Sequence, residues 1–226
     1  MILITGASRG IGKYLFDKFS ESGEIVLGTY NKTEPASCNM KNYSSVQVDS
    51  LVSVQNWVNL IKDKRKLVLI NCAGINYNCY SHKVDMEKWK RVIDVNLVGT
   101  FNVINTILPS MREEGFGRII NLSSIVAQMG TPGTSAYAAS KSGLWGMTRS
   151  IAQENASLGI TINNLNLGYF NLGIINEVPI KYQEKIKESI PTHKFGEPIE
   201  IYNTIMNLIN SPYINGTSID INGALY

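Results

Sequence analysis

The chain has few of the residues that bind metals or form disulfide bridges. Its 226 residues include only three cysteines, Cys38, Cys72 and Cys79, and two histidines. An odd and sparse set of cysteines without metal-ligand spacing argues against a zinc site and a disulfide framework. Free thiols fit a reducing compartment. The sequence therefore predicts a cytoplasmic protein without a metal site.

Long apolar runs and clusters of charge are also missing. No apolar run approaches the roughly 18 residues that cross a bilayer, and the basic start and cleavage site of a signal peptide are absent. The net charge is +3, and no stretch contains five or more basic residues. The basic surface of a nucleic-acid-binding protein is thus lacking. Neither a membrane nor a nucleic acid is expected as a partner.

Short apolar runs alternate with longer segments of helical spacing. Strands apolar on both faces that alternate with helices are typical of a parallel sheet covered on both sides. We therefore predict an α/β protein with a doubly wound Rossmann fold, a mainly parallel seven-stranded sheet and helices on both faces. The expected strands are residues 2–4, 25–29, 46–48, 67–71, 119–122, 162–165 and 218–221, and helices are expected at 11–22, 52–64, 86–114 and 136–158.

Neither a low-complexity linker nor an internal repeat divides the chain, so residues 1–226 are expected to form one domain. Residues 31–44 are polar and irregular, which predicts a loop. Residues 168–198 interrupt the alternation and carry three prolines around a charged amphipathic piece at 180–190. Because an insertion after a strand's carboxyl end lies over the crevice of an open sheet, this segment is predicted to be a short substrate lid.

A glycine-rich turn follows the first predicted strand and precedes a helix. Glycines permit positive φ and close backbone approach, and the free N–H groups of a new helix suit a pyrophosphate. Three glycines alone would also fit a tight turn without a ligand, but the strand–turn–helix context favours dinucleotide binding. The residues expected to bind it are Gly6, Ser8, Arg9, Gly10, Ile11 and Gly12.

The end of the second predicted strand indicates which dinucleotide to expect. An acid there would accept hydrogen bonds from the ribose hydroxyls of NAD, but the chain has Tyr30, Asn31 and Lys32. Arg9 and Lys32 can supply positive charge to a 2′-phosphate, and Asn31 can donate hydrogen bonds. NADP(H) is therefore favoured over NAD(H). The alternative is that Arg9 and Lys32 are simply exposed surface residues.

Tyr137 and Lys141 are spaced i and i+4 in a segment of helical pattern, which places both side chains on one face. An unperturbed tyrosine titrates near about pH 10, and a nearby cation lowers that value. A general acid works best when its pKa lies near the working pH. The pair therefore predicts Tyr137 as a proton-transfer residue assisted by Lys141. Taken alone, the same spacing also fits a solvated helix face.

Further polar residues accompany this pair. Ser123 and Ser124 follow the fifth predicted strand, fourteen and thirteen residues before Tyr137. A hydroxyl at a strand's carboxyl end can hydrogen-bond a substrate oxygen. Asn96 lies inside the apolar segment 86–114, where it would also fit a buried amide satisfied by neighbouring backbone. The prediction of an active site depends on the turn, serine, tyrosine and lysine occurring in this order.

With these residues in place, the sequence resembles the short-chain dehydrogenase/reductase family over nearly its whole length. The turn from Thr5 to Gly12 matches the family's cofactor turn, and Asp49 matches the acid that meets the adenine ring. The segment 71–74 matches the family's Asn-Asn-Ala-Gly apart from Cys72. The family's catalytic tetrad matches Asn96, Ser124, Tyr137 and Lys141, and further cofactor-binding residues implied are Asp49, Asn71, Ala73, Gly74, Tyr137 and Lys141.

The resemblance implies that NADP(H) delivers a hydride to a carbonyl carbon while Tyr137 protonates the oxygen. It implies that Ser124 steadies that oxygen, that Lys141 lowers the pKa of Tyr137 and binds the ribose, and that Asn96 holds a water linking Lys141 to solvent. The predicted helices at 86–114 and 136–158 resemble those that pair subunits in the family. A homodimer or homotetramer is therefore expected.

Within the family, the chain most resembles 3-oxoacyl-[acyl-carrier-protein] reductases, so a small or acyl-carrier-linked carbonyl substrate is expected. Two alternatives remain. One is a reductase of another carbonyl, such as a nucleotide-linked sugar in polysaccharide synthesis. The other is a catalytically weak NADP(H)-binding regulatory or assembly protein. Two departures keep the last alternative open: Leu167 and Leu172 stand where the family has Pro and Thr, and Asn171 is a candidate substitute for the Thr.

Overall fold

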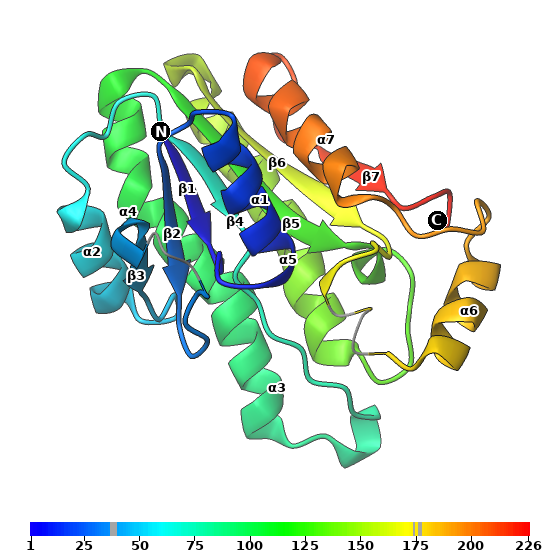
Figure 1. Cartoon of the computed structure of the whole chain (residues 1–226). Coiled ribbons are helices and arrows are strands. Elements are labelled where there is room, and N and C mark those ends of the chain that lie inside the picture. The colour runs from blue at the N-terminus through cyan, green and yellow to red at the C-terminus, as the bar shows by residue number, and fades with distance from the viewer. Residues whose placement is uncertain (37–39, 174, 176–177) are drawn as a thin grey trace.

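A computed structural model of the protein describes residues 1–36, 40–173, 175 and 178–226. The strands are β1 (Ile2–Thr5), β2 (Val26–Tyr30), β3 (Tyr43–Ser45), β4 (Val68–Asn71), β5 (Gly117–Ser124), β6 (Ile160–Leu167) and β7 (Ser218–Ile221). They form one parallel sheet in the order β3-β2-β1-β4-β5-β6-β7 (Figure 1). The order reverses between β1 and β4, where an open sheet of this kind forms its ligand crevice.

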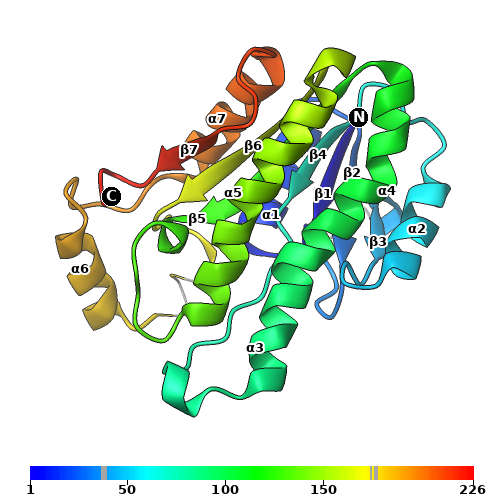
Figure 2. The same ribbon diagram turned by 180° about the vertical axis from the view of Figure 1, so that it is seen from behind.

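Helices cover both faces of the sheet. They are α1 (Gly10–Glu21), α2 (Leu51–Leu60), α3 (Met86–Ile93), α4 (Gly99–Glu114), α5 (Ser135–Asn155), α6 (Ile180–Ser189) and α7 (Pro198–Asn210). Apolar residues of α1 and α7 pack on one face (Figure 1), and those of α2, α4 and α5 pack on the other (Figure 2). The predicted Rossmann fold with a seven-stranded sheet is therefore confirmed.

The third strand lies earlier in the chain than the sequence predicts. We expected residues 46–48, but β3 comprises Tyr43–Ser45, so part of the expected loop at 31–44 belongs to the sheet. Val46 and Val48 are nevertheless buried, because they pack in the core between the sheet and α2. The alternation of apolar residues therefore indicates burial here, although Val46 and Val48 are not part of a β-strand.

The expected helix at 86–114 is continuous but changes its winding in the middle. Between α3 and α4, residues Asp94–Val98 form a π-helical turn that contains Asn96. Such turns are rare and occur often at functional sites. By length and composition alone, the helix Met86–Glu114 could cross a membrane: its 18-residue apolar window has a mean hydropathy of 1.3, and 44% of that window is buried inside the fold.

The expected lid at 168–198 contains α6, whose ten residues match the amphipathic piece seen in the sequence. Residues 174, 176 and 177 of this segment lie outside the described residues. Its base forms a separate apolar cluster, in which Ile190 and Phe195 are buried and Leu225 packs against them. Helix α7, which begins at Pro198, was not expected from the sequence.

Candidate active site

The turn after β1 requires glycine at two positions for steric reasons. A Cβ at Gly12 would lie 2.2 Å from the carbonyl oxygen of Gly6, and a Cβ at Gly6 would lie 2.7 Å from the Cα of Ala73. Gly6 also has a φ of +66°, which favours glycine. The turn therefore packs backbone against backbone, and it leaves the first N–H groups of α1 at the carboxyl edge of the sheet, where an anion can bind.

Two threonines connect the strand ends around this turn. The hydroxyl oxygen of Thr5 accepts hydrogen bonds from the backbone N–H groups of Cys72 at 3.1 Å and Ala73 at 3.2 Å. The hydroxyl oxygen of Thr29 accepts a hydrogen bond from the Gly6 N–H at 3.3 Å. Neither hydroxyl is among the residues expected to bind the cofactor, although hydroxyl residues at strand ends were the available signal.

The adenine end of the predicted cofactor site is marked by Asp49. One of its carboxylate oxygens is bonded to Arg91 and also accepts a hydrogen bond from Gln47 Nε2 at 3.3 Å. The other oxygen, Oδ1, is buried and has no hydrogen-bond partner among the described residues. Because an unpaired buried acceptor is costly, this position fits a ligand that donates a hydrogen bond, such as the amino group of adenine.

The residues predicted to meet the 2′-phosphate lie nearby in the fold. Asn31 and Lys32 are exposed directly after β2, and the exposed Arg9 precedes the first residue of α1. No acidic residue occupies positions 30–32. The observed residues therefore fit an NADP(H) molecule, with positive charge next to the turn and no carboxylate to repel a phosphate.

The structure brings the four candidate catalytic residues together at the carboxyl edge of the sheet. Ser124 is the last residue of β5, and its hydroxyl lies close enough to the phenol of Tyr137 to lower the pKa of that phenol. Lys141 follows one helical turn later on α5, with its Nζ 5.6 Å from the centre of the Tyr137 ring. That Nζ also donates a hydrogen bond to the Leu122 carbonyl at 2.6 Å.

Asn96 fixes the loop after β4. Its Oδ1 accepts a hydrogen bond from the Ile75 N–H at 2.8 Å, and its Nδ2 donates to the Ile75 carbonyl at 2.9 Å and to the Ser140 hydroxyl at 3.1 Å. Both of its amide hydrogens are thus used within the protein. The side chain connects the π-helical turn to the residue that precedes Lys141. A Cβ at Gly74 would lie 3.3 Å from Asn96 Oδ1 and 3.9 Å from Lys141 Nζ.

Burial controls the pKa values of the site. Burial raises the pKa of Tyr137 to about 12, the nearby Cys72 thiol adds to this increase, and the hydrogen bond from Ser124 opposes it. Burial lowers the pKa of Lys141 to about 8. Burial therefore has the largest effect on both pKa values, and the expected lowering of the Tyr137 pKa by Lys141 stays a prediction.

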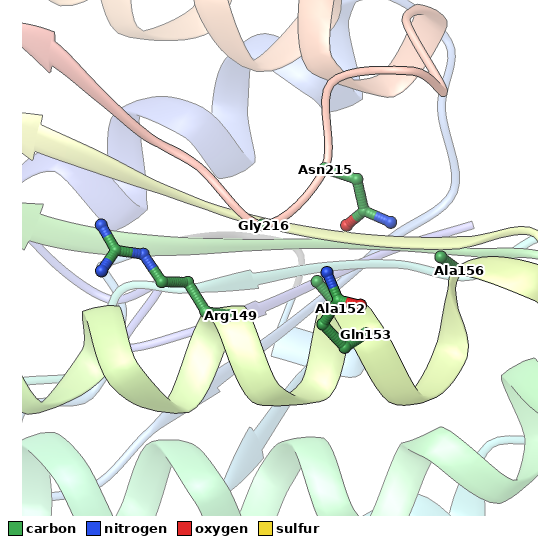
Figure 3. Close-up of a pocket in the computed structure, with 6 residues that line it drawn as sticks. All are labelled: Arg149, Ala152, Gln153, Ala156, Asn215 and Gly216. Atoms are coloured by element: carbon green, nitrogen blue, oxygen red, sulfur yellow. The ribbon is translucent and has the colours of Figure 1, made fainter.

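Two cavities lie outside this group of residues. One of about 540 Å³ separates α3 from the loop after β4 and is lined by Ile75 and Arg91, among others. The other, of about 160 Å³, lies between α5 and the segment before β7 (Figure 3). Its Arg149 is twelve residues beyond Tyr137, or roughly 18 Å along the helix at 1.5 Å per residue. Neither cavity contains a tetrad residue.

Comparison with known proteins identifies the family. A family model described as short chain dehydrogenase matches residues 1–182. The chain belongs to the short-chain dehydrogenase family. The resemblance inferred from the sequence motifs is therefore confirmed.

Two curated relatives of this short-chain dehydrogenase match nearly end to end. It is 34% identical to the 3-oxoacyl-[acyl-carrier-protein] reductase FabG of Staphylococcus epidermidis, over 99% of this chain and 98% of the relative. It is 33% identical to the acetoacetyl-CoA reductase of Shinella zoogloeoides, over 99% and 97%. Its fold matches a crystal structure named as a candidate gluconate dehydrogenase from Agrobacterium tumefaciens, with a TM-score of 0.89, 25% identity and coverage of 100% and 95%.

The two departures from the family pattern have different structural settings. Leu167 is buried in the core beneath α1 and α7, and it extends β6 by pairing with Ser124 on one side and Ile221 on the other. Leu172 precedes Gly173, which approaches Gly10 closely, so this departure lies beside the cofactor turn. Asn171 is exposed.

Proposed function

We propose that this short-chain dehydrogenase is a cytoplasmic, NADP(H)-dependent reductase of the ketone in a 3-oxoacyl thioester. The observation that carries the proposal is the grouping of Tyr137 with the Ser124 hydroxyl and the Lys141 ammonium, whose Nζ lies 5.6 Å from the centre of the Tyr137 ring. It joins a proton donor, a second hydroxyl and a cation where a carbonyl oxygen can bind. By their names, the two relatives act on a 3-oxoacyl group carried by a protein and on acetoacetyl-CoA.

Each residue then has one task. When bound, the dinucleotide supplies the hydride that adds to the carbonyl carbon. Tyr137 gives its phenolic proton to the carbonyl oxygen, and Ser124 donates a hydrogen bond to the same oxygen. Lys141 stabilises the phenolate that remains. Asn96 keeps the loop after β4 against α5, so that the crevice retains its shape.

Turnover separates the candidate functions. We expect the enzyme to oxidise NADPH with acetoacetyl-CoA and with a 3-oxoacyl carrier protein, followed by NADPH absorbance. The named gluconate dehydrogenase suggests gluconate with NADP⁺ as the rival substrate. Oxidation of gluconate without reduction of thioesters would replace the proposed substrate. Absence of turnover with a panel of ketones, including sugar ketones, would favour a protein that only binds the dinucleotide.

The charge after β2 should set the cofactor preference. Replacing the exposed Lys32 by Glu puts a carboxylate where the 2′-phosphate is expected to bind. We expect the ratio of kcat/KM for NADPH to that for NADH to fall about tenfold or more, because like charges repel at short range. Lys62→Glu makes the same charge change in the segment before β4, at the amino ends of the strands. This variant should leave the ratio of kcat/KM values unaltered. An unchanged ratio in Lys32→Glu would rule out this site for the phosphate.

A homodimer or homotetramer belongs to the same proposal. Val98 and Phe101, at the π-helical turn and the start of α4, are large apolar residues with 43% and 46% of their surface exposed. Burying them against a second copy would remove apolar area from water. Light scattering should give a mass of at least twice 25.0 kDa, and Phe101→Glu should lower it to that of the monomer.

A further inference from the structure

A series of hydrogen bonds connects the edge strand β7 to the segment that follows Ser124. Asp220 on β7 accepts a hydrogen bond from Asn166 Nδ2 at 2.7 Å through Oδ1, and from Gln128 Nε2 at 3.1 Å through Oδ2. Asn166 is on the neighbouring strand β6, and Gln128 follows β5. One carboxylate therefore joins two strands and the loop that begins at the catalytic serine.

The series continues through a tryptophan to the catalytic helix. The indole N–H of Trp145 is shared between Asn166 Oδ1 at 3.1 Å and the Ser123 hydroxyl oxygen at 3.3 Å. Ser123 in turn donates to the backbone carbonyl of Lys141 at 3.3 Å. The hydrogen-bond network thus reaches the backbone carbonyl of Lys141 and also Ser123, the residue next to Ser124.

Segment 125–134 links Ser124 to α5, and its position decides how the serine hydroxyl is directed. The hydroxyl oxygen of Ser124 accepts a hydrogen bond from the Val126 N–H at 3.4 Å, so the serine caps the start of the segment. Among the described residues, two side-chain hydrogen bonds join the segment to other elements: the Ser142 hydroxyl on α5 donates to the Ala127 carbonyl at 3.0 Å, and Gln128 Nε2 donates to β7 at 3.1 Å. Asp220 is the acceptor of the second bond.

We propose that Asp220 is a positioning residue for the reaction: through Gln128 and Asn166 it holds segment 125–134, and with it the hydroxyl of Ser124, in place. This inference rests on the proposed function, since it takes Ser124 to contact the substrate oxygen. The cofactor turn is built from the ends of β1, β2 and β4. Loss of Asp220 should therefore affect turnover more than binding of the dinucleotide.

The test compares Asp220→Ala with Asp220→Asn in the full-length protein. Asp220→Ala removes two hydrogen bonds, so we expect kcat/KM for acetoacetyl-CoA to fall about tenfold. Backbone amides of segment 125–134 should exchange hydrogen faster, while the Kd for NADPH changes by less than about twofold. Asp220→Asn should keep most activity, because its amide can donate to Gln128 Oε1, which is buried and unpartnered among the described residues.

Two further variants make the test specific. If Gln128 and Asp220 act as one unit, the double variant Gln128→Ala/Asp220→Ala should lose no more activity than Asp220→Ala alone. Asp63→Ala removes an exposed carboxylate before β4, at the far edge of the sheet, and should change neither exchange nor kcat/KM.

The proposal is overturned if the backbone amides of segment 125–134 exchange hydrogen at the wild-type rate in Asp220→Ala. It is also overturned if the losses of activity in Gln128→Ala and Asp220→Ala add up in the double variant. Unchanged kcat/KM beside faster exchange also overturns it, since the loop would then move without consequence for catalysis. If the wild-type protein reduces no carbonyl compound, the proposed function is wrong instead. In that event hydrogen exchange alone still decides whether Asp220 holds the segment.

Discussion

Replacing Tyr137 by Phe is expected to lower kcat roughly a thousandfold, the size of effect usual for a general acid. The substitution removes one oxygen and keeps the ring that lies 5.6 Å from the Lys141 ammonium. The dinucleotide site is built mainly from the ends of β1, β2 and β4, so the Kd for NADPH should stay within about twofold. Turnover is followed by NADPH absorbance at saturating acetoacetyl-CoA, and binding by NADPH fluorescence.

Tyr213→Phe is the matched control for this prediction. It removes the same oxygen from a tyrosine that is fully exposed in the loop before β7, and it should leave kcat unchanged. If Tyr137→Phe keeps more than about a tenth of wild-type turnover, Tyr137 does not carry the proton. In that case, Ser124 or a water molecule would have to donate it.

The fold was predictable because its signals are local. The strands of a doubly wound sheet are short apolar runs, and six of the seven overlap the predicted ranges. Helix α7 was missed although the sequence contains two signals for the start of a helix. Pro198 occupies the first turn, and Glu197 and Glu200 form a capping box. Grouping Pro198 with the lid hid this signal.

The candidate site was predictable as a set of residues but not in its electrostatics. The i, i+4 spacing placed Tyr137 and Lys141 on one face of α5, as the structure shows. The direction of their pKa values depends on how much water the surrounding elements exclude, and no spacing encodes that. The same holds for Asn96, whose partners Ile75 and Ser140 lie 21 and 44 residues away.

The network of Asp220 did leave a trace in the sequence. Strand β6 alternates Asn164, Leu165, Asn166 and Leu167, and β7 carries Asp220 between two isoleucines. A two-residue alternation of polar and apolar side chains is unexpected in a sheet buried on both faces. It shows that one face of these strands is lined with hydrogen-bonding groups. Only the fold reveals that Gln128 is one of their partners.

Replacing Lys141 by Met should stabilise the protein while it removes activity. The difference between the ordinary pKa of 10.5 and about 8 corresponds to roughly 3 kcal/mol spent on keeping this buried ammonium charged. Met is an unbranched apolar side chain one atom shorter than Lys, and it loses the hydrogen bond to the Leu122 carbonyl, worth about 1 kcal/mol. We expect the free energy of unfolding at pH 7 to rise by about 2 kcal/mol and the Tm by about 4–8 °C.

The pH dependence of stability provides the check on this explanation. Because the folded pKa of Lys141 lies below its unfolded value, the unfolded chain binds more protons above pH 8, and wild-type stability rises with pH there. Above about pH 9 the trend reverses, since burial raises the pKa of Cys72 to about 11 and that of Tyr137 to about 12. Urea unfolding between pH 7 and 9 should show the rise in the wild type and in Lys185→Met, which alters an exposed lysine, but not in Lys141→Met. A Lys141→Met protein less stable than the wild type at pH 7 would mean that the ammonium stabilises the fold, and that its burial is not a cost accepted for catalysis.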